Sequence, residues 1–440
     1  RRKRGLGEVS RMPKLEDETA RANTYIAHDA DWIDFRTTVC TAPDQVALAP
    51  GYLQKEYSRD GRHCFDYAMD RPMQKFFAYL SARWQVKKDN YQGIAIEVYY
   101  DAKHPYNVDR MIASVKKSLA YYQANFTPYQ FRQVRIIEFP GYGSFAQSFA
   151  NTIPYSESIG FIADLRDKEA IDYVYYITAH EVAHQWWAHQ VIGANMQGST
   201  MLSESLAEYS ALMVMEKEYG RGKMRRFLRY ELDAYLSGRG SDLVEEQPLF
   251  RVENQQHIHY RKGALVFYRL REELGEKAVN RALKKFLLDK GYQNPPYTTS
   301  RELLGYLRAE AGPKQQQLIT DLFEKISFYD NRLEHATAKR RADGKYDVTL
   351  DLRASKLYAD GKGKETAGRL DDWVEIGVFA RGSSGTESDE KVLYLQRQHV
   401  AEATSRVTVV VDSEPYEAGF DPYNKLIDRV ATDNRKRISF

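Results

Sequence analysis

Residues 179–187 contain the pattern His-Glu-x-x-His, formed by His180, Glu181 and His184. On an α-helix, residues four positions apart lie on the same face. His180 and His184 can therefore offer two ring nitrogens to one metal ion, and Glu181 is placed to act on a water molecule bound to that ion. Residues 171–177 are almost all apolar, so we expect a buried helix. Unpaired buried polar groups are costly, and a metal ion would supply the partner that these side chains need.

A second helical stretch offers the remaining ligand. Catalytic zinc is typically held by three protein ligands, and a fourth position stays open for water. In the stretch 201–209, Glu204 and Glu208 are four residues apart and share a helix face. We interpret Glu204 as the third ligand, beside His180 and His184. Glu208 is predicted to orient a ligand histidine through its other ring nitrogen. The sequence therefore predicts a site for one Zn²⁺ ion.

The length and composition of the chain limit its class. With 440 residues it suits two or three domains, and its 43% hydrophobic content allows ordinary cores. The net charge is +3 with both signs well mixed, so the sequence carries no signature of nucleic-acid binding. No apolar run is long enough to cross a membrane. The first residue is Arg1 and not Met, and we expect the basic start 1–4 to follow a segment outside this chain.

The chain has two cysteines, Cys40 and Cys64, both in strand-like stretches. Their spacing is not Cys-x-x-Cys, which argues against a cysteine metal site. Two interpretations remain open. The cysteines form a disulfide if the chain works in an oxidising compartment, or they are two unpaired cysteines of the core.

The order of periodic segments predicts an α+β chain of three domains. Residues 1–100 read mostly as strands, with 1–30 charged and partly loose, and we expect a small N-terminal antiparallel β domain. Residues 101–331 read mainly as helices and contain both metal motifs. Residues 332–440 alternate in hydrophobicity between turn signals, which is typical of a β-sandwich. Within this last domain, 382–385 predicts a hairpin loop.

Four motifs resemble the aminopeptidase N family of gluzincins, which includes leukotriene hydrolase, and they follow one another along the chain in the family's order. The His-Glu-x-x-His motif at 180–184 is followed by Ser203–Tyr209, which resembles the family's N-E-G-F-A-E-Y. Upstream, Glu157–Phe161 resembles the tail of the family's G-A-M-E-N-W-G-L motif. Downstream, Tyr260–Ala264 resembles the Y-x-K-G-A segment that carries the family's catalytic tyrosine. The end of the chain, 409–429, also resembles the closing strands of the family's β-sandwich.

The resemblance implies a thermolysin-like, mainly helical catalytic domain between β domains, and a metallopeptidase activity. In that mechanism a zinc-bound water attacks the peptide bond. Glu181 takes its proton and later gives it to the leaving amine. Tyr260 donates a hydrogen bond to the oxyanion. By the same resemblance, Glu157 binds the free α-amino group of the substrate. The expected enzyme is therefore an aminopeptidase that acts on peptides with a free N-terminus.

The sequence departs from the family pattern in two places. The spacing between His184 and Glu204 is one residue longer than usual, and we expect the extra residue in the loop 193–199. The segment Pro154–Ser158 replaces the glycine and alanine of G-A-M-E-N. The second departure bears on amine recognition by Glu157 and leaves an endopeptidase that ignores the substrate amine as an alternative.

A further resemblance bears on location and partners. The spelling of Met201–Ser210, together with the basic start, resembles the peptidase-like domains fused to bacterial ABC transporter permeases. It implies an extracytoplasmic, periplasmic-side protein attached to the membrane through a permease segment that precedes Arg1. It also supplies a hypothesis from another class, in which the chain is a low-turnover peptide-binding or regulatory domain of a membrane transporter.

Overall fold

The computed structural model describes residues 2–8, 10–167, 169–382 and 389–440. Arg1 and most of the predicted hairpin loop, Ser383–Gly385, lie outside this set. The described chain has N-terminal sheets, a central helical region and C-terminal sheets, so the predicted α+β class is confirmed. It divides into two compact units, which are described separately. Unit 1 comprises residues 1–215, 250–255 and 274–315, and unit 2 comprises residues 216–249, 256–273 and 316–440.

Unit 1 begins with short antiparallel strands, as the alternating pattern predicts. The largest sheet among them has the strand order β2-β5-β4, and smaller sheets pair β1 with β6 and β3 with β7. The strands are β1 (Trp32–Ile33), β2 (Arg36–Thr41), β3 (Val46–Leu48), β4 (Tyr52–Arg59), β5 (Arg62–Ala68), β6 (Met73–Gln74) and β7 (Leu80–Ala82).

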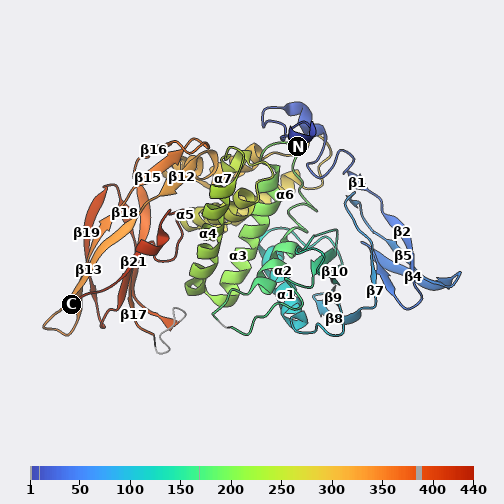
Figure 1. Ribbon diagram of the computed structural model, residues 1–440, viewed down its shortest axis with the longest axis horizontal. Helices are drawn as coiled ribbons and strands as arrows, with labels where there is room; N and C mark the ends of the chain where they lie inside the picture. The colour runs from blue at the N-terminus through green and yellow to red at the C-terminus, as the bar shows by residue number, and fades with distance from the viewer. Residues whose placement is uncertain (1, 9, 168, 383–388) are drawn as a thin grey trace. The chain divides into compact units, whose positions relative to one another are not determined.

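A four-stranded mixed sheet follows, with the order β11-β10-β9-β8. Its strands are β8 (Gln85–Tyr91), β9 (Ile94–Tyr100), β10 (Gln133–Phe139) and β11 (Thr152–Ser156). β9 and β10 are parallel because helix α1 (Val108–Asn125) connects them as a crossover. Figure 1 shows α1 and the metal-motif helix α2 (Tyr173–Ala183) beside these strands. The predicted domain boundary at residue 100 therefore falls within this sheet, between β9 and β10.

Unit 1 also contains helices that follow α2 in the chain. Thr299 and Glu302 form a capping box that starts α7 and satisfies two backbone N–H groups. Among the described residues, no helix combines the length and the apolar character that a membrane span requires. The helices of unit 1 that follow α2 are the first part of α3 (Leu206–Tyr219), α6 (Glu276–Lys290) and α7 (Ser300–Glu310).

Unit 2 combines helices with the C-terminal sheets. The sheets β13-β14-β19 and β18-β17-β20-β21 both contribute to one apolar cluster that includes Val348, Leu350, Ile376 and Phe420, as expected for two sheets packed face to face. The helices are α4 (Met224–Ser241), α5 (Gly263–Leu274) and α8 (Gln316–Ile319). The strands are β12 (Ile326–Tyr329), β13 (Arg332–Arg340), β14 (Tyr346–Arg353), β15 (Lys356–Ala359), β16 (Glu365–Ala367), β17 (Asp372–Ala380), β18 (Lys391–Val400), β19 (Thr404–Val411), β20 (Glu417–Phe420) and β21 (Arg435–Arg437).

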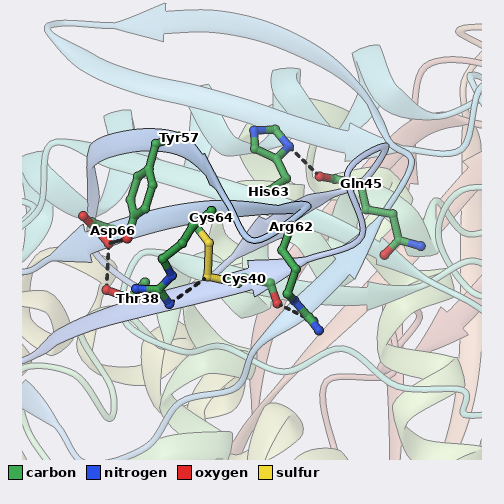
Figure 2. Close-up of a disulfide and its surroundings, with 9 residues drawn as sticks. Thr38, Cys40, Gln45, Tyr57, Arg62, His63, Cys64 and Asp66 are labelled. Atoms are coloured by element: carbon green, nitrogen blue, oxygen red, sulfur yellow. Dashed lines mark hydrogen bonds between the residues drawn. A yellow bond between two sulfur atoms is a disulfide. The ribbon is translucent and has the colours of Figure 1, made fainter.

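Of the two interpretations of the cysteines, the structure has the disulfide. Cys40 in β2 lies directly opposite Cys64 in β5, and the two are bonded (Figure 2). The Arg62 guanidinium donates to the Cys40 carbonyl oxygen at 3.0 Å. The bond therefore joins two strands that already pair with each other.

Removing this disulfide is expected to destabilise the sheet β2-β5-β4. The two cysteines are 24 residues apart in the sequence. Without the bond, the unfolded chain gains conformational entropy, which stabilises it by about 3 kcal/mol relative to the folded state. We expect a Cys40→Ser/Cys64→Ser variant to lose about this much free energy of unfolding in denaturant titrations. Reductant should lower the stability of the wild type by a similar amount and leave the variant unchanged. Two free thiols in denatured, unreduced wild type would contradict the pairing.

Two buried aspartates are expected to make the stability of unit 2 depend on pH. Burial raises the pKa of Asp421 to about 7 and that of Asp428 to about 6. In an unfolded chain aspartate titrates near pH 4, so between about pH 4 and 7 the folded protein holds more protons. Its free energy of unfolding must then fall as the pH rises.

We expect thermal unfolding midpoints to decrease from pH 5 to pH 8, and Asp421→Asn to make this decrease shallower. Asparagine tolerates the positive φ of 53° at this position and keeps an acceptor for the Lys425 N–H. The exposed substitution Glu402→Gln is the matched control and should retain the wild-type slope. An unchanged slope in Asp421→Asn would refute this assignment.

Candidate metal centre

Helix α2 presents the two motif histidines and the motif glutamate from one buried turn. It begins at the Asp172 cap, whose carboxylate accepts a hydrogen bond from the Tyr175 N–H at 3.0 Å. The apolar residues that follow are buried against α1, where Tyr122 donates its hydroxyl to the Ala179 carbonyl oxygen at 2.8 Å. His184 caps the helix at its C-terminal end. The packing of α2 therefore fixes where the motif residues lie.

Three ligand atoms converge at this turn. His180 Nε2 lies 2.9 Å from His184 Nε2, and Glu204 Oε2 lies 3.3 and 3.2 Å from these two nitrogens. Tetrahedral zinc with bonds of about 2.0–2.1 Å places its ligand atoms about 3.3 Å apart. The three atoms therefore already have nearly the separations that one zinc ion requires, and their nitrogen and carboxylate chemistry suits that ion.

The electrostatics of this cluster also favour a cation. Burial alone would lower the pKa of His180, but the carboxylates of Glu208 and Glu204 outweigh it and raise this pKa well above its usual value. Charges that hold a proton on a buried histidine also attract a divalent cation, which binds by displacing that proton. The side chains present therefore fit the predicted Zn²⁺.

Second contacts fix both histidine rings. Glu208 Oε1 lies 3.2 Å from His180 Nδ1, and the hydroxyl of Tyr176 donates to the other oxygen of this carboxylate. His184 Nδ1 lies 3.1 Å from the carbonyl oxygen of Trp187. Partners of this kind hold the Nε2 atoms toward a metal and set the ring tautomer. Glu208 therefore lies beside the other ring nitrogen of His180, and its role in orienting that ring stays a prediction.

Glu204 lies in a π-helical turn, η3 (Met201–Ser205), which leads directly into α3. Turns of this kind hold one residue more than an α-helical turn and often mark functional sites. The turn is therefore a second place, beside the loop 193–199, for the extra residue between His184 and Glu204.

Glu181 has the properties of a proton acceptor. Its side chain is buried, and its Oε2 atom has no hydrogen-bond partner in the described part of the chain. Burial raises the pKa of Glu181, and with the smaller contributions of the Glu204 and Glu208 carboxylates it outweighs the lowering effect of His184 and His180. A carboxylate with a raised pKa accepts a proton near neutral pH more effectively than an ordinary one.

The structure does not bring Glu157 to the cavity beside the metal ligands. Glu157 Oε1 accepts the Gly141 N–H at 2.7 Å, and Oε2 lies 3.9 Å from His104 Nδ1. With Glu138 these residues form a second group of His and Glu side chains. Amine binding by Glu157 stays a prediction, and the contacts described here do not support it.

Tyr260 belongs to unit 2, in the π-helical turn η6 (His257–Lys262) that leads into α5. The metal ligands belong to unit 1. Its hydrogen bond to the oxyanion therefore stays a prediction from the resemblance.

A cavity of about 490 Å³ in unit 1 opens beside the ligands His184 and Glu204. Part of its wall comes from the N-terminal segment, which the sequence predicts to be partly loose. The one sign in the sequence that this segment packs against the rest of the protein is a few apolar residues, such as Tyr25 and Ile26, within a charged stretch. The described residues that line it are Ser10, Met12, Tyr25, Ile26, Phe76, Gln147, Ser148, His184, Ala188, Asn195, Thr200, Glu204 and Asn254.

Comparisons with known proteins agree with this geometry. Residues 110–325 match the model of the peptidase family M1 domain. Endoplasmic reticulum aminopeptidase 2 of Homo sapiens is 23% identical over 211 residues, which cover 46% of this chain and 22% of that protein. Aminopeptidase M1-B of Oryza sativa subsp. japonica is 23% identical over 325 residues, which cover 63% of this chain and 35% of that protein. The chain thus spans between about a fifth and a third of these curated relatives.

The fold likeness extends further along the chain. The structure of Legionella pneumophila aminopeptidase A, solved in complex with aspartic acid, aligns with a TM-score of 0.58 at 18% identity. The alignment covers 90% of this chain and 44% of that one. At this identity the likeness concerns the fold alone.

Proposed function

We propose that this chain, which carries a peptidase family M1 domain over residues 110–325, is a zinc-dependent aminopeptidase. The observation that carries the proposal is the convergence of His180, His184 and Glu204 within about 3 Å of one another, next to the buried Glu181. The family match implies that the substrates of this enzyme are peptides.

Each side chain has a definite task in the proposed reaction. His180, His184 and Glu204 would hold the ion, while Glu208 and the Trp187 carbonyl oxygen keep the rings in position. When bound, the zinc would supply a Lewis acid that lowers the pKa of a water molecule and polarises the substrate carbonyl.

Glu181 accepts the proton of the attacking water and returns it to the leaving amine. Tyr260 is proposed to stabilise the oxyanion, and Glu157 is the candidate for binding the substrate amine. Both assignments rest on the resemblance of their motifs.

A peptidase that does not require a free amino group is a second candidate. Among the described residues that line the metal cavity, Glu204 is the one carboxylate, and it is a metal ligand. Glu157 makes its contacts with Gly141 and His104 instead. This placement favours a site that binds the substrate without pairing its ammonium group with a carboxylate.

We further propose an extracytoplasmic location, with attachment to a membrane through a permease segment of the ABC transporter type. The Cys40–Cys64 disulfide supports an oxidising compartment. The proposal predicts that the native full-length protein fractionates with membranes and is cleaved by protease added from the periplasmic side.

The deciding experiment compares reporter amides of single amino acids, each with a free or an acetylated amino group. Zinc-loaded wild type that cleaves the free amides alone would support the aminopeptidase. Cleavage of both series would support the second candidate. A zinc-loaded protein that cleaves neither series would favour the low-turnover binding domain.

A further inference from the structure

Residues 10–26 are held against the rest of unit 1 by side-chain and backbone contacts. Leu15 is 1% exposed and packs in an apolar cluster with Ile192, Met196 and Tyr297. The Arg11 guanidinium pairs with the Glu253 carboxylate at 2.5 and 2.9 Å. These contacts join residues far apart in the sequence, so the segment is held by tertiary structure and not by a local fold.

Backbone hydrogen bonds fasten the same segment along its length. The Gln197 N–H donates to the Pro13 carbonyl oxygen at 2.9 Å, and the Tyr297 N–H donates to the Arg21 carbonyl oxygen at 2.8 Å. Further on, Thr24 forms an antiparallel bridge with Ala194. We call residues 10–26 the N-terminal strap.

The strap reaches the metal centre at two points. Ser10 and Met12 line the cavity at one end of the strap, and Tyr25 and Ile26 line it at the other. The Tyr25 hydroxyl donates to Ser203 Oγ at 2.8 Å, and Ser203 directly precedes the ligand Glu204. The strap is therefore a wall of the cavity in which a substrate of the metal centre would lie.

Apart from the metal ligands, the described side chains that line this cavity are uncharged. Its apolar side chains include Met12, Ile26 and Phe76, and its polar ones are amides and hydroxyls, such as Gln147 and Thr200. Among the described residues that line it, none is a lysine, an arginine or an aspartate. A charged substrate side chain would lose its hydration here without gaining an ionic partner, which is costly.

We propose that the strap selects substrates whose side chain at this cavity is uncharged and apolar, through Met12 and Tyr25. This inference rests on the proposed peptidase function and adds a substrate class to it. A change in the fit of an apolar side chain to such a wall alters selectivity by about tenfold or more. The strap is thus a determinant of specificity that comes from outside the metal-motif helices.

The test measures binding as well as turnover. Amino-acid hydroxamates, which chelate zinc, are titrated into the zinc-loaded protein by calorimetry, with leucine, phenylalanine, aspartate and arginine side chains. We expect the wild type to bind the two apolar hydroxamates at least about tenfold more tightly than the two charged ones. The same four side chains are compared as reporter amides, through KM and kcat separately.

Three strap variants locate the effect. Met12→Ala and Tyr25→Ala should each change the ratio of leucine to phenylalanine hydroxamate affinity by about fivefold or more. With the reporter amides, the corresponding change should appear mainly in KM. Tyr25→Phe keeps the ring and should retain the wild-type ratio. Lys14→Ala is the matched control, because Lys14 is an exposed strap residue that does not line the cavity. Zinc content should be equal in all of them.

The outcomes separate this inference from the proposed function. Selective hydroxamate binding without any hydrolysis would refute the peptidase and keep the strap as a wall of a binding site. Hydrolysis with unchanged selectivity in both alanine variants would refute the strap and keep the peptidase. Equal or tighter binding of the charged hydroxamates by the wild type would also overturn the inference.

Discussion

Glu181→Gln is expected to lower kcat/KM for peptide hydrolysis by about 10³-fold without loss of zinc. The substitution keeps the shape of the side chain but removes its ability to accept a proton, and general acid–base catalysis contributes about 10²–10⁴-fold. Because Glu181 lies outside the ligand set His180, His184 and Glu204, the ion should stay bound. Initial rates with a free-amine reporter amide and metal analysis of the same samples measure both quantities.

Two other results with Glu181→Gln would contradict this expectation. A loss of both activity and zinc would mean that Glu181 supports the site structurally. An unchanged rate would exclude it as the base and point to another acceptor. Far-UV circular dichroism of the variant shows whether the fold is retained.

Removing Glu204 is expected to have the largest effect on the metal itself. Glu204→Gln takes one of three ligands from the cluster, and we expect the affinity for zinc to fall by about 10³-fold or more. Glu208→Gln disturbs a partner of His180 and should cost about 10–100-fold. Competition with a chromophoric chelator at fixed pH measures all of these affinities on one scale.

Glu138 supplies the matched control for the zinc titration. It is a buried carboxylate of unit 1 in the second His and Glu group, with His104 and Glu157. We expect Glu138→Gln to retain one zinc per chain with wild-type affinity. Loss of zinc in this variant, or retention of zinc in Glu204→Gln, would contradict the assignment of the metal centre.

Local spacing was sufficient to pair the two histidines and the two glutamates, whereas the approach of Glu204 to the histidines depends on the packing of two separate elements. A separation of four residues on a helix brings His180 and His184 together whatever the rest of the chain does. The same rule puts Glu208 on the face of Glu204, within reach of His180. Each of these relations depends on one turn of helix.

The position of Glu157 depends on strand register, which a short motif does not determine. β11 ends at Ser156, so Glu157 follows the sheet, and the cavity is instead lined by Gln147 and Ser148 from the segment before β11. A match of a few letters does not show which side of a strand faces the site.

The strap could not be recognised in the sequence for a related reason. Its composition is that of a loose charged stretch, and its order comes from contacts with partners such as Ile192 and Tyr297. Such long-range contacts leave no periodic signal, and a segment with few apolar residues reads as disordered until its partners are known. The sheet that contains β9 could not be predicted for the same reason, because the strand that pairs with β9 in parallel, β10, follows only after helix α1.

The π-helical turn at Met201–Ser205 has a consequence for the evolution of this chain. One residue rotates a regular helix by about 100°, but a π-helical turn holds its extra residue without changing the phase of the helix that follows. Trp187 donates to Ser210 Oγ at 2.9 Å and Tyr209 donates to Asn280 at 3.0 Å, and both bonds need the present phase. A length change of one residue between His184 and Glu204 can therefore be accommodated in this turn as well as in the loop 193–199, while the hydrogen bonds of α3 to the core are kept.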